Sequence, residues 1–214
     1  MKKTKVKLLL LAVCCFTTVS IKAQNGDTVI QVTQINKSIQ AFAKLLDSQQ
    51  LQKFGLKSID ELKALKPGKQ FKKLMIGLND IKKFKQGDDV QKIIKDYPSI
   101  EVSLVDQAGN IKTSIEFVMN QGKWEASRYG STHELAILRN AQTALANSDF
   151  QRGSLIRIPA LRISFIAVSS AAGLEFINLE DNQKLNLKKG EKIAASAAIL
   201  RLVPLAAKHN GLPS

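Results

Sequence analysis

The stretch Gly130–Leu138, GSTHELAIL, places a histidine next to a glutamate where an apolar helix begins. These two residue types hold zinc and supply a general base in metalloprotease helices, and that chemistry needs a second histidine one turn after the first. The corresponding position here is Ile137, and the other histidine, His209, lies far along the chain. The sequence therefore excludes a zinc helix of this class.

The same stretch fits the start of an ordinary helix. Ser131 and Glu134 repeat the pattern Ser-x-x-Glu-Leu-x-x-Leu that begins earlier at Ser58 and Glu61. A pattern used twice, once without histidine, indicates a capping box, in which the hydroxyl accepts from a first-turn amide and the glutamate reaches back to the cap N–H. We predict that Ser131 caps a helix and that His133 is an exposed first-turn residue.

Other catalytic patterns are missing from the sequence. After residue 23 it contains no Gly-x-Ser-x-Gly turn, no Ser-x-x-Lys and no glycine-rich phosphate loop. The acidic pairs Asp88-Asp89 and Glu180-Asp181 lie outside any calcium-loop pattern, which favours solvated turns. We therefore predict no catalytic, cofactor-binding or metal-binding residue. A hydrolase whose carboxylates or serine meet only in the fold is the alternative.

The N-terminal residues 1–23 have the features of a secretory signal peptide. Lysines precede the apolar run Leu8–Phe16, and Ala23 ends a signal-peptidase site. Cys14 and Cys15 lie inside the apolar run, and Val13 before Cys14 disfavours a lipid anchor. We expect a protein exported to the periplasm or the extracellular space, with no disulfide and no membrane-spanning segment after cleavage.

Lysines give the chain a strongly basic character. The formal net charge is +14, and loss of the five lysines of residues 1–23 lowers it to +9. Lysines outnumber acids 14 to 7 between Lys37 and Asp96, which is typical of a solvated helical face or of a surface for anionic envelope polymers or lipid head groups. Nucleic acid is disfavoured, because this region lacks stacking aromatics. The candidate ligand surface comprises Lys72, Lys73, Lys82, Lys83, Lys85 and Trp124.

Helices dominate the first part of the mature chain. An apolar stripe predicts one helix over Thr28–Lys53 that packs on the protein's own sheet, and it comprises Val32, Ile35, Ile39, Phe42 and Leu46. A short helix follows Ser58 and is expected to stop at Pro67-Gly68. A short strand within residues 71–78 and short helices at 80–84 and 88–95 complete this segment.

Alternating residues predict strands further on. Residues 100–104, 111–119 and 124–129 are typical of an antiparallel meander with one wet face, followed by a helix over 132–147. The apolar segment Leu155–Ser169 is interrupted by Pro159, and it precedes a strand at 174–179 and a last helix over 191–209. We predict an α+β fold, with helices packed on antiparallel meanders in two β-β-β-α halves.

This pattern also sets the expected organisation of the chain. Residues 24–98 form a helix-rich segment, 99–149 a meander plus helix, and 150–214 a second β segment plus C-terminal helix. Residues 24–214 are expected to form one compact unit. No residue matches between the halves establish a duplication, which stays a hypothesis.

The run IKTSIEFVMNQGKWEASRYG, with its Gly-Lys-Trp turn, resembles the hairpin of small exported bacterial domains with a cystatin-like or NTF2-like arrangement. The resemblance covers residues 88–147, and the Lys-Ala-Gln after the signal resembles exported proteins of Bacteroidota. It implies a helix packed on a curved antiparallel sheet and no particular activity. The export signal, the lysine-rich surface and the missing catalytic patterns lead us to expect a non-catalytic binding or interaction module of the envelope. Its partner is expected to be an unknown envelope component, and an anionic one is the alternative that the lysines favour.

The capping interpretation predicts the effect of Ser131→Ala. Loss of an N-cap hydroxyl should lower the free energy of unfolding by about 1 kcal/mol. Denaturant unfolding of the two proteins measures the difference. Equal midpoints would contradict a capping role.

Overall fold

The computed structural model describes residues 29–183 and 185–210, so the predicted signal peptide lies outside the described residues. Its helical elements are α1 (Val32–Ala43), α2 (Ser48–Lys53), α3 (Ile59–Ala64), α4 (Leu78–Lys83), η1 (Val90–Ile93), α5 (Thr132–Ala144), α6 (Asn147–Arg152), η2 (Pro159–Leu161) and α7 (Ala195–Lys208). Its strands are β1 (Lys66–Ile76), β2 (Ile94–Val105), β3 (Ile111–Asn120), β4 (Lys123–Tyr129), β5 (Ser154–Ile158), β6 (Ile163–Ser170), β7 (Gly173–Asn178) and β8 (Lys192–Ala194).

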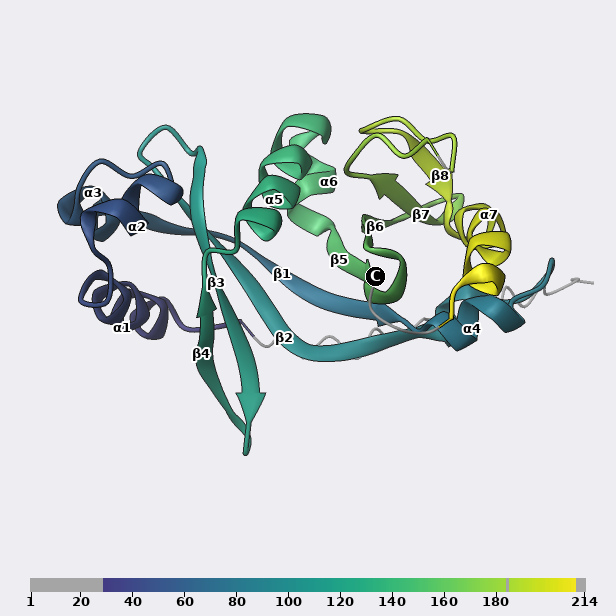
Figure 1. The fold of residues 1–214 in the computed structure, drawn as a ribbon, viewed down its shortest axis with the longest axis horizontal. Coiled ribbons are helices and arrows are strands. Elements are labelled where there is room, and N and C mark those ends of the chain that lie inside the picture. Colours follow the sequence, from purple (N-terminus) through teal and green to yellow (C-terminus); the bar gives the residue numbers. More distant parts are fainter. Residues whose placement is uncertain (1–28, 184, 211–214) are drawn as a thin grey trace, which may run out of the picture.

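All eight strands form one sheet, in the order β4-β3-β2-β1-β5-β6-β7-β8 (Figure 1). Neighbouring strands are antiparallel except for the central pair, in which Lys73–Met75 of β1 run parallel to Leu155–Arg157 of β5. The predicted α+β class is confirmed. The predicted meander is also present, as β2, β3 and β4.

The two halves of the sheet repeat one order of elements. A short helix, α3 or α6, leads into four strands that run outward from the centre, and a long helix, α5 or α7, follows the last strand. The prediction of three strands per half was too low. It shortened the central strand β1 and missed β8, which has only three residues.

Helices cover both faces of the sheet (Figure 1). α5 and α6 lie over the middle of one face, where Leu138 and Phe150 pack with Phe71, Leu155 and Ile166. The other face is covered in two parts. α1, α2 and α3 pack on β2 and β3 at one end, and α4 and α7 pack on β5, β6 and β7 at the other.

The predicted helix over Thr28–Lys53 is two helices. α1 ends at Ala43, and Asp47 begins α2 with a complete capping box to Gln50, which competes with a continuous helix. The stripe packs on the protein's own core, with Ile35 and Phe42 buried. Val32 was expected on that stripe, but it is 56% exposed.

Two further boundaries differ from the prediction because strand pairing overrides local signals. The helix expected at 88–95 is only the 3-10 turn Val90–Ile93, and β2 begins at Ile94 and continues through Pro98. Pro98 is tolerated where the pairing of β1 with β2 shifts register. Pro67-Gly68 lies inside β1, and α3 has already ended at Ala64.

The second half agrees better with the predictions from the sequence. Pro159 breaks the apolar segment as expected, and it starts η2 between β5 and β6. The last helix begins at Ala195, because residues 192–194 pair with β7 as β8. Along the described part of the chain, no helix is both long and apolar enough to span a membrane.

Gly130, between β4 and α5, should tolerate no side chain. Its φ is +42°, and a Cβ would lie 2.4 Å from Phe54 and 2.6 Å from the Thr113 hydroxyl. Gly122 has a similar positive φ, +78°, but open space around it. Gly130→Ala should therefore destabilise the protein by about 2 kcal/mol or more, against about 1 kcal/mol for Gly122→Ala. Thermal or denaturant unfolding measures both, and equal losses would contradict the close packing at Gly130.

Candidate functional site

On β2 and β3 the polar face of the meander is buried under α5, which corrects the expectation of a wet face there, whereas the polar side chains of β4 are exposed. Strand register aligns three of its side chains in a row, because Glu101 of β2 lies opposite Glu116 of β3, and Glu116 lies opposite Arg128 of β4. Lys73 of β1 lies on the same face, two residues beyond the partner of Glu101. Glu134 approaches from α5.

Lys73 is the centre of this cluster, which we call the ionic network. Its Nζ lies 2.6 Å from Glu101 Oε2, 2.8 Å from Glu116 Oε1 and 3.7 Å from Glu134 Oε1. Two arginines complete the network at its rim. Arg128 pairs with Glu116, and Arg157 of β5 pairs with Glu134. Three carboxylates and three cations leave it formally neutral.

Burial and ion pairing act against each other on the pKa values. Burial by itself raises the pKa of Glu116, but hydrogen bonds from Lys73 and Arg128 outweigh it and lower the pKa to about 2. For Glu101 the balance reverses, since burial raises its pKa more than Lys73 lowers it. Burial lowers the pKa of Lys73, yet the surrounding carboxylates raise it above its usual value.

The geometry of the network suits structure better than chemistry. The side chains of Lys73, Glu101, Glu116 and Glu134 are only 1% to 6% exposed, which leaves a substrate no access to the carboxylates. The ammonium of Lys73 occupies the place that a metal ion would take among the three glutamates. Within residues 29–183 and 185–210, no group of three His, Cys, Asp or Glu side chains is arranged to hold a metal.

Glu134 corrects the interpretation of the opening motif. The Ser131 hydroxyl does accept from the Glu134 N–H, at 3.4 Å, so the cap is present. The carboxylate of Glu134 is buried in the ionic network and does not complete a box. At Ser58 the hydroxyl also caps its helix, accepting from the Glu61 N–H at 3.1 Å, but the predicted box is not formed, because the Glu61 carboxylate accepts from the N–H of Lys57, one residue before the cap. His133 is exposed, as expected.

The candidate ligand residues do not form one surface. Lys73 is buried in the ionic network, whereas Lys72 lies on the opposite face of β1 and pairs with Asp96 at 2.9 Å. Trp124 packs at the end of the sheet covered by α1, against the core that contains Phe42. The remaining lysines lie on or just after α4, at the other end of the sheet (Figure 1), and they are Lys82, Lys83 and Lys85.

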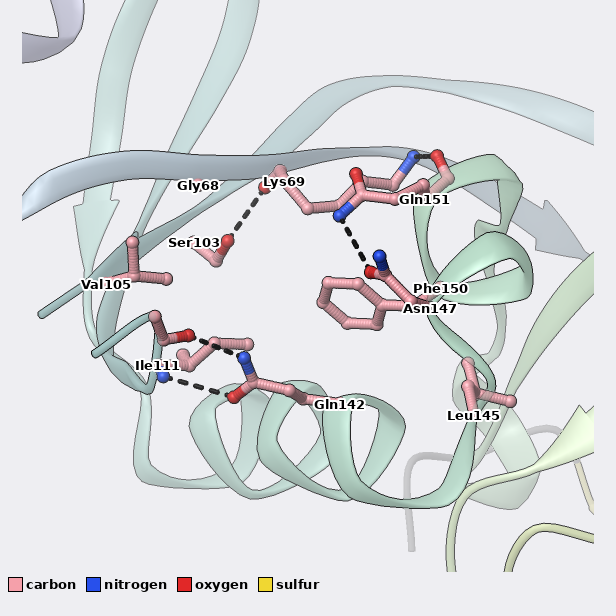
Figure 2. A pocket seen from close by; sticks show the side chains of 11 residues that line it. Gly68, Lys69, Ser103, Val105, Ile111, Gln142, Leu145, Asn147, Phe150 and Gln151 are labelled. Carbon is pink, nitrogen blue, oxygen red and sulfur yellow. Dashed lines mark hydrogen bonds between the residues drawn. The ribbon is translucent and has the colours of Figure 1, made fainter. Parts of the chain in front are cut away.

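A pocket of about 310 Å³ opens between the start of β1, the end of β2 and the helices α5 and α6; Figure 2 shows its lining. The ring of Phe150 points into it, with Val105, Ile111 and Leu145 as further apolar walls. Lys69 and several neutral polar side chains complete the lining, namely Ser103, Gln142, Asn147 and Gln151. We call this the amide pocket.

Hydrogen bonds hold the polar walls of the amide pocket. Gln142 accepts from the Ile111 N–H at 3.2 Å and donates to the Gly109 carbonyl at 2.7 Å, which ties α5 to the turn after β2. Ser103 donates to the Lys69 carbonyl at 3.0 Å. That hydroxyl proton is committed to a carbonyl oxygen rather than to a base, so Ser103 lacks the activation of a nucleophile.

In comparisons with known proteins, the chain matches no protein-family model, no curated protein and no solved structure. The resemblance to cystatin-like or NTF2-like domains therefore stays a prediction.

Sequence reasoning missed both sites. The alternation Glu101-Ser103 and Ser114-Glu116 was visible, but alternating polar residues usually face water, and nothing local shows that α5 covers them. Leu155 to Ile158 carry Arg157 inside an otherwise apolar strand, which was the available signal for a buried acid. The amide pocket joins residues from five elements, β1, β2, β3, α5 and α6, and no spacing pattern links them.

The ionic network predicts a pH-dependent loss in Glu116→Gln. In the folded protein the pKa of Glu116 is about 2, below its usual 4.5. Its contribution to the free energy of unfolding is therefore complete above pH 4.5 and disappears as the pH falls through 2. At neutral pH the free energy of unfolding of the variant should be about 3 kcal/mol lower, because Lys73 and Arg128 keep their charges without this partner. Urea unfolding between pH 7 and pH 2 should show the difference shrinking with acid.

Glu101→Gln is the matched control. The pKa of Glu101 is raised, so its ionised form contributes less to stability than that of Glu116. Glu101→Gln should therefore lower the free energy of unfolding at neutral pH by less than Glu116→Gln does. A loss in Glu116→Gln that stays constant with pH, or an equal loss in both variants, would contradict the assignment.

Proposed function

We propose that this chain is an exported, non-catalytic binding protein of the bacterial envelope, and that the amide pocket takes a small neutral ligand carrying amide groups. The observation that carries this proposal is the lining of the pocket. The side chains of Gln142, Asn147 and Gln151 surround the ring of Phe150 (Figure 2). Amide side chains both donate and accept, and they match an amide in a ligand while an aromatic ring packs on its apolar part.

The separation of charge from the pocket supports binding without chemistry. The buried carboxylates of the sheet are enclosed with Lys73 in the ionic network and do not line the amide pocket. Lys69 contributes the one ionisable side chain of the lining, and its ammonium donates to the Gln151 carbonyl. General acid–base catalysis needs a titrating group within reach of the substrate, and this lining favours recognition instead.

The test is a titration of the full chain with N-acetyl-leucine amide and with N-acetylglucosamine, followed by NMR shifts of backbone amides. We expect shifts to gather at residues of the amide pocket, with both probes recovered chemically unchanged. Shifts confined to other surfaces, or hydrolysis of either probe, would overturn the proposal.

Asn147→Trp provides the matching variant. Asn147 is exposed at the mouth of the pocket, so an indole there should block the pocket and weaken binding at least tenfold, with a stability change within about 0.5 kcal/mol. Ser148→Trp is its control, because Ser148 is also exposed on α6 but does not line the pocket. Equal affinity of the two variants for the probes would contradict this site.

A further inference from the structure

A second pocket, of about 640 Å³, lies where the end of α7 meets η2 and the loop after β7. Its six polar lining residues include two cations, Arg162 and Lys208, and one acid, Asp181; the other three are Asn182, Gln183 and His209. We call it the basic pocket. It lies in the second half of the sheet, and it shares no lining residue with the amide pocket.

Part of the positive charge near this pocket stabilises the carbonyl end of helix α7. α7 ends at Lys208, and the carbonyl end of a helix carries partial negative charge. Lys82 of α4 donates to the His209 carbonyl at 2.9 Å, and Lys208 lies in the last turn. The Lys82 ammonium therefore offsets part of the negative charge at the helix end. The single acid is also engaged, since Asp181 accepts from the Lys189 N–H at 2.8 Å.

Arg162 is the cation that the fold does not explain. Along the described part of the chain its guanidinium has no ion pair or side-chain hydrogen bond, while its backbone N–H donates to the Pro159 carbonyl. It also has a left-handed backbone conformation, with φ 53° and ψ 40°, which costs a residue other than glycine about 1 kcal/mol. Glycine would fit this turn better, so the arginine at this place needs another reason.

The remaining walls of the basic pocket are apolar. Leu161 and Ile163 flank Arg162 in the sequence, and Leu205 of α7 also lines the pocket; all three are part-buried or buried. A guanidinium beside an ammonium binds a phosphate through several charge-assisted hydrogen bonds. Apolar walls next to these cations suit a ligand that carries a hydrocarbon part beside its anion.

We propose that the basic pocket binds the phosphate group of an amphiphilic phosphate ester, with Arg162 and Lys208 on the phosphate and Leu161 and Leu205 on its hydrocarbon part. The ester has two sources, a soluble metabolite or the head group of a membrane lipid, and both present the same chemistry. This inference is independent of the amide pocket.

The test uses three probes on the full chain: inorganic phosphate, soluble dihexanoyl phosphatidic acid, and phosphatidylcholine vesicles with or without phosphatidylglycerol. We expect the soluble ester to bind at least tenfold more tightly than inorganic phosphate, if the source is a metabolite. Binding that is confined to vesicles containing phosphatidylglycerol assigns a lipid head group. Binding of none of the probes, or equal binding of phosphate and ester, overturns the proposal.

Arg162→Gly separates binding from folding. It removes the guanidinium and leaves glycine at a left-handed position, so the variant should be at least as stable as the wild type while it binds the ester or the vesicles about tenfold more weakly. Lys208→Ala should weaken binding similarly. Lys188→Ala is the charge-matched control, because Lys188 is exposed in the same loop but does not line the pocket.

If Lys188→Ala weakened binding of the ester or the vesicles as much as Arg162→Gly does, the net charge of the protein alone would explain the binding. That result would overturn the site. Asn147→Trp should bind the phosphate probes as the wild type does. That variant distinguishes failure of the amide pocket from failure of the basic pocket.

Discussion

A lysine in the middle of a sheet can be buried only if carboxylates surround it, and this constraint organises the protein. Lys73 lies on the central strand β1, and its three glutamates come from β2, β3 and α5. Replacing such a cluster with apolar residues often costs a protein little, but removing one member leaves an uncompensated charge. The network therefore contributes little net stability, and its main effect is to select one register of the strands. A register slip of one residue would move Glu101 or Glu116 to the opposite face, away from Lys73.

The same strand joins the two halves of the molecule. β1 pairs with β2 on one side and, in parallel, with β5 on the other, so the halves share one sheet rather than two cores side by side. Strand directions repeat outward from this central pair, while α5 and α7 lie on opposite faces. A twofold axis along β1 and β5 would produce this arrangement, because it keeps strand direction and exchanges faces. Whether the halves arose by duplication stays a hypothesis.

Charge within the molecule is divided between its interior and its surface. Within the described residues, the acids of the central face are buried with Lys73, and none of them lines the amide pocket or the basic pocket, which differ in chemistry. One presents amides around an aromatic ring, and the other presents cations beside apolar walls.

The sequence by itself determined the class of fold, the meander and the helix caps. These features depend on neighbours within a few residues, such as Ser131 and Glu134 or the turn before Trp124. Only the tertiary structure decided that Glu134 and Lys73 meet, and that the polar face of β2 and β3 is covered. These contacts join residues 61 positions apart in the chain, and their energy depends on desolvation that arises only when α5 closes over the sheet. For the same reason Lys73, which was expected on a ligand surface, is buried at the centre of the ionic network.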